Sequence, residues 1–268
     1  MSNSDDSNLA LFCDFENIAL GVRDAKYAKF NINKILERLL VKGSIVVKKA
    51  YCDWERYRDF KATMHGAAFE LIDIPHVRQS GKNSADIRMV VDALDLCYTK
   101  SHVNTFIIIS GDSDFSPLVS KLRENAKTVI GVGVKNSTSD LLISNCDEFI
   151  FYDDLVREQK KTGQAKKASK GRKTKRKTTK SAKKDKKQEG IDLALEAARA
   201  LNAERGDREN LWGSMVKQTL KRRRPGFSEN AYGFDSFSEL LEEARERGQI
   251  TLELDERSGG YIIRNIEH

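Results

Sequence analysis

The sequence has only four cysteines, and none of them is placed to build a zinc site. Cys13, Cys52, Cys97 and Cys146 form no C-x-x-C pair and have no histidine at zinc-ligand spacing. At least three of them lie in or beside apolar runs, which predicts buried, reduced thiols of the kind found in cytosolic proteins.

Long apolar runs, a secretory leader and a dinucleotide-binding loop are also missing. The first residues, MSNSDDSN, are polar and acidic, and no apolar stretch approaches the length of a membrane span. The GVGVK run at residues 131–135 lacks the G-x-G-x-x-G spacing of a dinucleotide loop. We therefore expect a soluble, cytoplasmic protein without a membrane partner.

Positive charge is concentrated in one tract. The net charge is +7, yet residues 160–187 hold 15 Lys and Arg against one acid, so this tract carries +14 and the rest of the chain −7. Residues 157–188 have almost nothing to bury, which predicts a disordered basic linker. Such a tract would bind nucleic-acid phosphates by counterion release. A solubilising linker, or a nuclear address in a eukaryotic source, would have the same composition.

Residues 8–156 alternate short apolar runs with amphipathic stretches. Runs of strand length and composition occupy residues 9–13, 44–52, 69–74, 105–110, 128–134 and 148–152. Helical patterns lie between them at residues 31–41, 54–65, 84–99, 116–126 and 138–145. This alternation predicts an α/β domain in which helices cover both faces of a parallel sheet.

Residues 189–266 regain periodicity after the basic tract. Helical patterns at residues 191–203, 211–223 and 236–248 precede strand-like runs at 250–254 and 261–264. Three helices followed by a hairpin predict a small, winged-helix-like α+β domain.

Two acids stand where strands of the predicted parallel sheet end. Asp14 follows the first apolar run and Asp112 follows the run at 105–110. Both therefore belong at the carboxyl edge of the sheet, where open α/β folds bind ligands. Asp86 lies in the first turn of the predicted helix at 84–99, from which it can point across the same edge.

That helix is predicted to begin with Ser84 as its cap. Its buried stripe is predicted to consist of Ile87, Val90, Val91 and Leu94. At 100° per residue the opposite, solvated face carries Arg88, Asp92 and Asp95, so the last two acids are not expected at the site.

Carboxylates that converge without arginine partners repel one another and raise their own pKa values unless a cation is present. Hard oxygen ligands select Mg²⁺ or Mn²⁺, which polarise a phosphodiester and activate a water for in-line attack. The acids together therefore predict a nuclease site. Taken singly, Asp14 could end a strand, Asp86 could suit a helix dipole, and Asp114 could cap the helix after the GDSD turn.

Three sequence blocks resemble the NYN domains, a branch of the PIN-like nuclease superfamily. The blocks are DFEN at residues 14–17, KNSAD at 82–86 and SGDSDFSPLV at 110–119. The resemblance covers roughly residues 8–155 and implies a Rossmann-like fold of PIN type with metal-dependent RNA cleavage. It implies Asp14, Asp86 and Asp112 as metal ligands, Asp114 as an accessory acid, Asn17 as a ligand or orienting group, and Lys82 as a phosphate contact.

Arginines and aromatic residues alternate in the stretch CDWERYRDF. Arg56 and Arg58, with Trp54 and Tyr57, could clamp a single RNA strand by charge and stacking. Aromatic residues three positions apart more often form one packed helix face.

Three further polar residues have ordinary interpretations. Asp140 could add another acid, although its position before LLISN favours a helix cap. His65 and His76 lack a third partner at ligand spacing, which favours roles outside a metal site.

The carboxyl-terminal segment resembles the LOTUS, or OST-HTH, domain. The match is carried by Trp212, residues 221–225, Phe227, Tyr232, Gly233, Phe237, Leu240 and Tyr261. This resemblance implies RNA binding and, as in some members, a helicase or other protein adaptor as partner. The candidate nucleic-acid surface consists of Lys217, Lys221, Arg222, Arg223 and Arg224, although cations at a helix end also suit the helix dipole.

The favoured hypothesis is therefore a metal-dependent ribonuclease with a module that binds RNA or an adaptor. The alternative is an RNA-binding adaptor or regulator of the same fold without catalysis. A phosphatase of the haloacid-dehalogenase type is disfavoured, because that chemistry needs an Asp two residues after its nucleophile, where this chain has Glu16.

Overall fold

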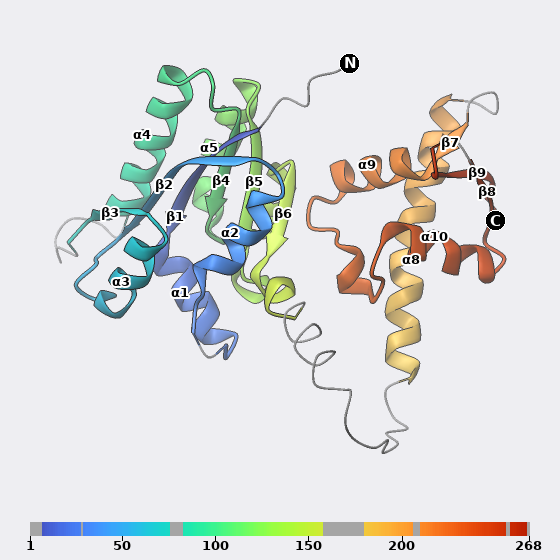
Figure 1. Cartoon of the computed structure of the whole chain (residues 1–268), viewed down its shortest axis with the longest axis horizontal. Helices are drawn as coiled ribbons and strands as arrows, with labels where there is room; N and C mark the ends of the chain where they lie inside the picture. The colour runs from blue at the N-terminus through green and yellow to red at the C-terminus, as the bar shows by residue number, and fades with distance from the viewer. Residues whose placement is uncertain are drawn as a thin grey trace. The chain divides into compact units, whose positions relative to one another are not determined.

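The computed structural model describes residues 7–27, 29–75, 83–157, 180–205, 210–255 and 258–266. The chain divides into two compact units, residues 1–164 and 165–268 (Figure 1). Each unit has a hydrophobic core of its own.

The first unit is built on a six-stranded sheet in which every paired strand runs parallel to its neighbour. Its strand order is β3-β2-β1-β4-β5-β6. The strands are β1 (Asn8–Asp14), β2 (Ser44–Cys52), β3 (Glu70–Asp73), β4 (Thr105–Ile109), β5 (Thr128–Gly133) and β6 (Glu148–Phe151). The prediction of a parallel sheet is confirmed.

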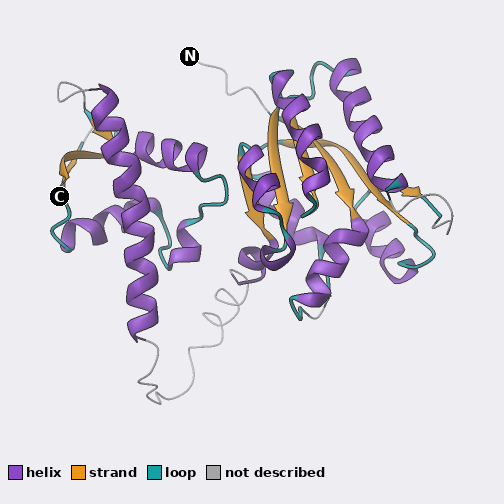
Figure 2. Ribbon diagram, turned by 180° about the vertical axis from the view of Figure 1, so that it is seen from behind, coloured by secondary structure: helices purple, strands orange, loops and turns teal. Residues whose placement is uncertain are grey.

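Helices cover both faces of this sheet, as predicted (Figure 2). One face packs against α1 (Phe15–Asp24), α2 (Ile32–Leu40) and α3 (Arg58–Gly66). The other packs against α4 (Ser84–Thr99), α5 (Ser116–Glu124) and α6 (Asp140–Asn145). Short 3₁₀ turns, η1 (Ser113–Phe115) and η2 (Lys135–Ser137), follow β4 and β5.

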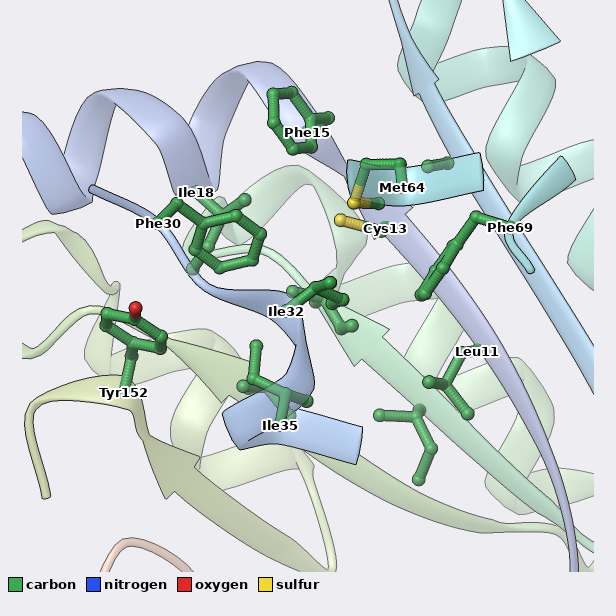
Figure 3. Packing of buried hydrophobic residues seen from close by; sticks show 14 of the residues in the cluster. Leu11, Cys13, Phe15, Ile18, Phe30, Ile32, Ile35, Met64, Phe69 and Tyr152 are labelled. Atoms are coloured by element: carbon green, nitrogen blue, oxygen red, sulfur yellow. The ribbon is translucent and has the colours of Figure 1, made fainter. Parts of the chain in front are cut away.

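The central strand β1 contributes to the cores on both faces. Leu11 and Cys13 pack with α1 and α2 residues such as Ile18 and Ile35 (Figure 3). Phe12 points to the opposite core. This alternation explains why the run reads as continuously apolar, since side chains of a strand buried on both faces need no polar positions.

The helix α1 was not among the helical patterns in the sequence. It begins directly after β1, with Asp14 as its N-cap and with Phe15, Ile18 and Val22 buried. The helix signal was therefore present in the spacing of these residues, but no turn residue separates the helix from the strand.

The prediction for α4 is wrong in its buried face. The helix buries Met89, Ala93 and Cys97, whereas Ile87 is 63% exposed and Val91 55% exposed. Val90 and Leu94 are only partly buried. The prediction failed because the apolar residues on the outer side of the helix have the same 3.6-residue spacing as a buried face.

Two polar positions of α4 also differ from the prediction. The N-cap is Asn83, not Ser84. Asp92 does not lie on a solvated face: its carboxylate accepts hydrogen bonds from the Tyr51 hydroxyl at 2.9 Å and from Arg88 Nε at 2.9 Å. Asp95 and Arg88 are exposed as predicted.

All four cysteines are free and buried, as predicted. Burial raises the pKa of each thiol, to about 12 for Cys146 and well above its ordinary value for Cys13. The thiols are therefore inert components of the core.

The second unit combines helices with a small antiparallel sheet, as predicted. Its elements are α8 (Lys180–Arg205), β7 (Leu211–Trp212), α9 (Gly213–Arg223), η3 (Glu229–Tyr232), α10 (Phe237–Glu246), β8 (Ile250–Leu254) and β9 (Tyr261–Ile266). The strand order is β7-β9-β8. Phe234 and Leu240 lie at the centre of its core.

The helix α8 begins inside the segment predicted as linker. Residues 180–188 are helical, so the disorder predicted for them is wrong. Residues 158–179, the remainder of the basic tract before this helix, lie outside the described residues. Across the described parts of both units, no helix has the length and apolar character of a membrane span.

Candidate active site

The carboxyl edge between β1 and β4 is the point where the strand order reverses. From β1 the chain proceeds outward to β2 and β3 and then returns to β4 on the other side of β1. In open α/β sheets, ligands bind outside the strand ends at such a switch point. The register pairs Cys13 with Ile109, so Asp14 and Ser110 leave the two strands side by side.

Asp14 is held by two hydrogen bonds at this edge. The Ser110 hydroxyl donates to Asp14 Oδ2 at 3.0 Å, and the Asn17 backbone N–H donates to Oδ1 at 3.3 Å as the first cap of α1. The Asp14 side chain is only 8% exposed. Asp14 therefore both ends β1 and caps α1, and the two hydrogen bonds hold its carboxylate in one orientation.

Ser110 connects the two strand ends. Besides donating to Asp14, its hydroxyl oxygen accepts the Asp112 backbone N–H at 3.2 Å. Asp112 in turn caps the short η1 turn, because its Oδ1 accepts the Asp114 N–H at 3.0 Å. Ser110 is fully buried. These bonds fix Asp14 and Asp112 relative to one another.

Asn17 ties α1 to the same loop. Its side-chain Oδ1 accepts the Gly111 N–H at 2.9 Å. Gly111 also accepts a hydrogen bond from the Ser139 N–H at 2.9 Å. A Cβ atom on Gly111 would lie 2.4 Å from the Ser137 carbonyl oxygen, so only glycine fits between α1 and the loop after β5.

Asp86 joins the acids from the first turn of α4. Burial raises the pKa of its carboxyl, and the negative charges of Asp112, Asp114 and Glu16 raise it further. Asp86 is therefore close enough to Asp112, Asp114 and Glu16 to interact with them electrostatically.

Asp14 has the most perturbed carboxyl of the group. Burial, and then the charge of Asp86, raise its pKa from the ordinary value of 3.8 to about 7, against the opposing effects of the Asn17 and Ser110 hydrogen bonds. The charge of Asp112 acts in the same direction as that of Asp86. A perturbation of this size from burial and like charges is typical of functional sites.

Within the described residues, Asp14, Asp86, Asp112 and Asp114 form no ion pair with Lys or Arg. No described cation therefore relieves the repulsion among them, and at Asp14 the hydrogen bonds from Ser110 and Asn17 oppose it. Also in the described parts of the chain, no three His, Cys, Asp or Glu side chains are arranged to hold one metal ion directly. The donor set still fits Mg²⁺, because this ion binds through one or two carboxylates and keeps several waters.

Two residues of this site were missed in the sequence. Ser110 could be recognised only from the strand register, which places it beside Asp14. Glu16 lies in the first turn of α1 and forms an ion pair with Arg56 at 3.2 Å. Glu16 lies in the DFEN block, and this position could have identified it as a site residue once the helix α1 had been recognised.

The predicted substrate-binding residues differ in burial and in their contacts with the acids. Arg56 lies next to the acids through its pair with Glu16, whereas Arg58 is exposed and lies 3.8 Å from Glu55. Trp54 is buried, donates to the Ile72 carbonyl and packs against Phe15, so it is not available to stack on a base. Lys82 lies outside the described residues.

Two of the other polar residues singled out in the sequence are exposed. Asp140 is the exposed first residue of α6, and the cap of that helix is Ser139. His65 is exposed in the last turn of α3. His76 lies outside the described residues.

The candidate cations of the second unit cluster at the end of α9. Lys221, Arg222 and Arg223 occupy its last turn. Lys217 pairs with Glu229 at 2.7 Å and Arg223 with Glu196 at 3.5 Å. Arg222 and Arg224 are exposed. Part of this predicted surface is therefore engaged within the unit.

Comparison with known proteins identifies a matching family and a similar solved structure. The family model described as NYN domain matches residues 8–153. The crystal structure of a protein of unknown function from Vibrio parahaemolyticus is 28% identical over 58% of this chain and 98% of its own, with a TM-score of 0.51. No curated protein sequence shows significant similarity to the chain.

Proposed function

Because the chain belongs to the NYN domain family, we propose that it is a ribonuclease that cleaves RNA phosphodiester bonds at the acidic edge between β1 and β4. The family belongs to the PIN-like nucleases, which supports a nuclease activity. The metal dependence, the RNA substrate and the role of the second unit are the parts that experiments must test.

Asp14, Asp86 and Asp112 would hold Mg²⁺ or Mn²⁺, with Asp114 as a supporting acid. Such an ion supplies Lewis-acid polarisation of the phosphodiester and an activated water. Ser110 keeps the Asp14 carboxylate oriented, and Asn17 holds the Gly111 backbone. Arg56 would contact a substrate phosphate once its ion pair with Glu16 is broken. Lys82, the first residue of the KNSAD block, would contact a phosphate as well.

The observation that carries this proposal is the buried Asp14 carboxylate, which has like-charged neighbours and, among the described residues, no ion pair with Lys or Arg. A buried carboxylate whose pKa is raised to about 7, by burial first and then by neighbouring carboxylates, is destabilising as it stands. A bound divalent cation would relieve that repulsion and would favour the ionised form.

The second unit would bring RNA or a protein adaptor, such as a helicase, to this site. Its sequence resemblance to LOTUS domains supports this role, and the basic tract at 160–187 would raise the local RNA concentration by phosphate binding. The exposed Arg222 and Arg224 are the proposed contacts at the end of α9.

An RNA-binding adaptor without catalysis is the second candidate. It is favoured by one observation, that no three described acids are arranged to hold an ion directly. Under this proposal the acidic edge would remain a feature of the fold, and RNA would bind without being cut.

The substitution Asp112→Asn separates the two functions. Full-length protein is incubated with end-labelled single-stranded RNA or DNA in Mg²⁺, Mn²⁺ or chelator. The nuclease proposal expects metal-dependent RNA cleavage that falls at least about 100-fold in the variant, while RNA affinity in chelator stays unchanged.

The matched control is Asp24→Asn, at an exposed aspartate in the last turn of α1. It should cleave as the unmodified protein does. RNA binding without cleavage in every metal would establish the adaptor function, and cleavage that persists in Asp112→Asn would remove Asp112 from the site.

A further inference from the structure

The helix α4 carries apolar side chains on its outer side as well as its inner side. Its inner side is the buried one formed by Met89, Ala93 and Cys97. On the outer side, Ile87 is 63% exposed, Val91 55% and Tyr98 64%. A surface helix is expected to be polar where it faces water, and a helix that is apolar on two sides is expected to be covered on both.

The outward residues form one continuous stripe along the helix. We define the α4 stripe as Ser84, Ile87, Val91, Asp95 and Tyr98, which at 3.6 residues per turn fall within an arc of about 80°. They span nearly all of the 16-residue helix. A shallow groove on this side of the helix is lined by four stripe residues, Ser84, Ile87, Val91 and Asp95, together with Arg88 and Asp92.

The spacing within the stripe is the same from either end. Successive members are separated by three, four, four and three residues, so the pattern is symmetric about Val91. An antiparallel copy of the helix, related by a two-fold axis at Val91, therefore sets every stripe residue opposite another stripe residue. Such self-complementarity is the property of an isologous interface.

The charges beside the stripe are complementary under the same pairing. Arg88 is exposed and uses its Nε to bond Asp92 on its own helix, which leaves the guanidinium with further donors. In the antiparallel arrangement Arg88 lies next to Asp95 of the second copy. By symmetry, Asp95 of the first copy lies next to Arg88 of the second. Each interface then gains two intermolecular ion pairs around an apolar centre.

From this geometry we propose that the α4 stripe is a homodimer interface, in which two copies of the chain pack α4 against α4 in antiparallel orientation about Val91. Val91 is the centre of the contact, where it meets Val91 of the other copy, Ile87 lies opposite Asp95, and the Tyr98 hydroxyl reaches Ser84 of the other copy. The interface does not depend on the nuclease activity.

The experiment is sedimentation velocity of the full-length protein from about 1 to 100 µM, a range that brackets a dimer of moderate affinity. The unmodified protein should change from monomer to dimer within it. Val91→Glu should raise the dissociation constant at least about tenfold, because two carboxylates then meet at the two-fold axis. Circular dichroism and the melting temperature show that the variant is folded.

The matched control is Val41→Glu, at an apolar residue that is 82% exposed at the end of α2 and outside the stripe. It should dimerise as the unmodified protein does. Asp95→Arg should weaken the dimer, and the double variant Arg88→Glu with Asp95→Arg should restore part of the affinity.

The proposal is overturned if the unmodified protein stays monomeric throughout, which would leave the stripe to a different partner, or if folded Val91→Glu dimerises normally through another surface. Loss of the dimer in Val41→Glu would show that the effect is not specific to α4. Failure of the double charge reversal to recover affinity would refute the antiparallel arrangement.

Discussion

Asp14 combines three demands in one side chain: it ends a buried strand, caps α1 and faces other carboxylates. The first of these was read from its position in the sequence, and the third was predicted from the expected parallel sheet. The cap required knowledge that a helix follows at once, and the electrostatic environment required knowledge of the strand order. The sequence can therefore propose a residue for a site without showing the hydrogen bonds that orient its side chain.

The raised pKa of Asp14 predicts a pH dependence of stability. Between pH 3.8 and about 7 the folded state binds more protons at Asp14 than the unfolded state does, so this group lowers the free energy of unfolding as the pH rises. Asp14→Asn removes the titration. In chelator at pH 8 the variant should be more stable than the unmodified protein by about 4 kcal/mol, because the pKa is raised by about three units at about 1.4 kcal/mol each, and the difference should shrink by pH 5.

Urea unfolding of the full-length protein at both pH values measures this difference. Asp24→Asn should leave the pH dependence unchanged. Addition of Mg²⁺ at pH 8 should stabilise the unmodified protein more than Asp14→Asn, since the variant has lost a ligand. Equal stability of Asp14→Asn and the unmodified protein at pH 8 in chelator would contradict the raised pKa.

Ser110 provides a second prediction at this scale. Ser110→Ala removes the donor to Asp14 and the acceptor for the Asp112 N–H, which should cost about 1 to 2 kcal/mol of stability. Because the Ser110 hydrogen bond lowers the pKa of Asp14, its loss should also move the acidic limb of the cleavage profile to higher pH. A merely structural role would reduce activity without moving that limb, and Ser120→Ala, an exposed serine of α5, is the control.

At the scale of elements, the strands could be predicted and the helices only in part. Strand β4 is buried on both faces, so its apolar run was unmistakable. Helix α1 was hidden because no turn separates it from β1. The inner face of α4 was misread because its outer residues are apolar as well. Periodicity shows that a helix has an apolar face, but it cannot say which of two such faces the sheet will cover.

The loop after β4 depends on one glycine for its shape. Gly111→Ala would place a methyl group 2.4 Å from the Ser137 carbonyl oxygen, and backbone must move to accommodate it. We expect a loss of at least about 2 kcal/mol in stability, together with a loss of cleavage because Asn17 and Asp112 shift with the loop.

Gly66→Ala is the comparison, because nothing lies within 4 Å of a Cβ atom at that helical position. Alanine there should be neutral or stabilising by about 0.5 to 1 kcal/mol. Thermal unfolding measures both variants. A Gly111→Ala variant with unchanged stability and activity would mean that the loop has room that the structure does not show.

At the scale of the whole molecule, the separate cores predict separate unfolding. The first unit is stabilised by two cores around its sheet and the second by a third core around α8, α9 and α10. The charge distribution predicted two structured parts divided by a basic tract. The charge distribution could not show that α8 begins at Lys180. A lysine-rich run has the composition of a disordered linker, yet lysine is also a good helix former.

Leu240→Ala tests this independence. Leu240 is fully buried in the core of the second unit, so its truncation should destabilise that unit by about 2 to 5 kcal/mol. The transition of the first unit should stay where it is. Ile107→Ala, at a fully buried residue of β4, should do the reverse. A single cooperative transition that moves in both variants would show that the units unfold together.

The inert thiols have a practical consequence for measuring this protein. Since all four native cysteines are buried and their thiolates are disfavoured, maleimide and nitroxide reagents should react with the folded chain only where a cysteine is newly introduced. A probe attached to Tyr98→Cys would report spin–spin or fluorescence distances without the need to replace any of the four native cysteines first.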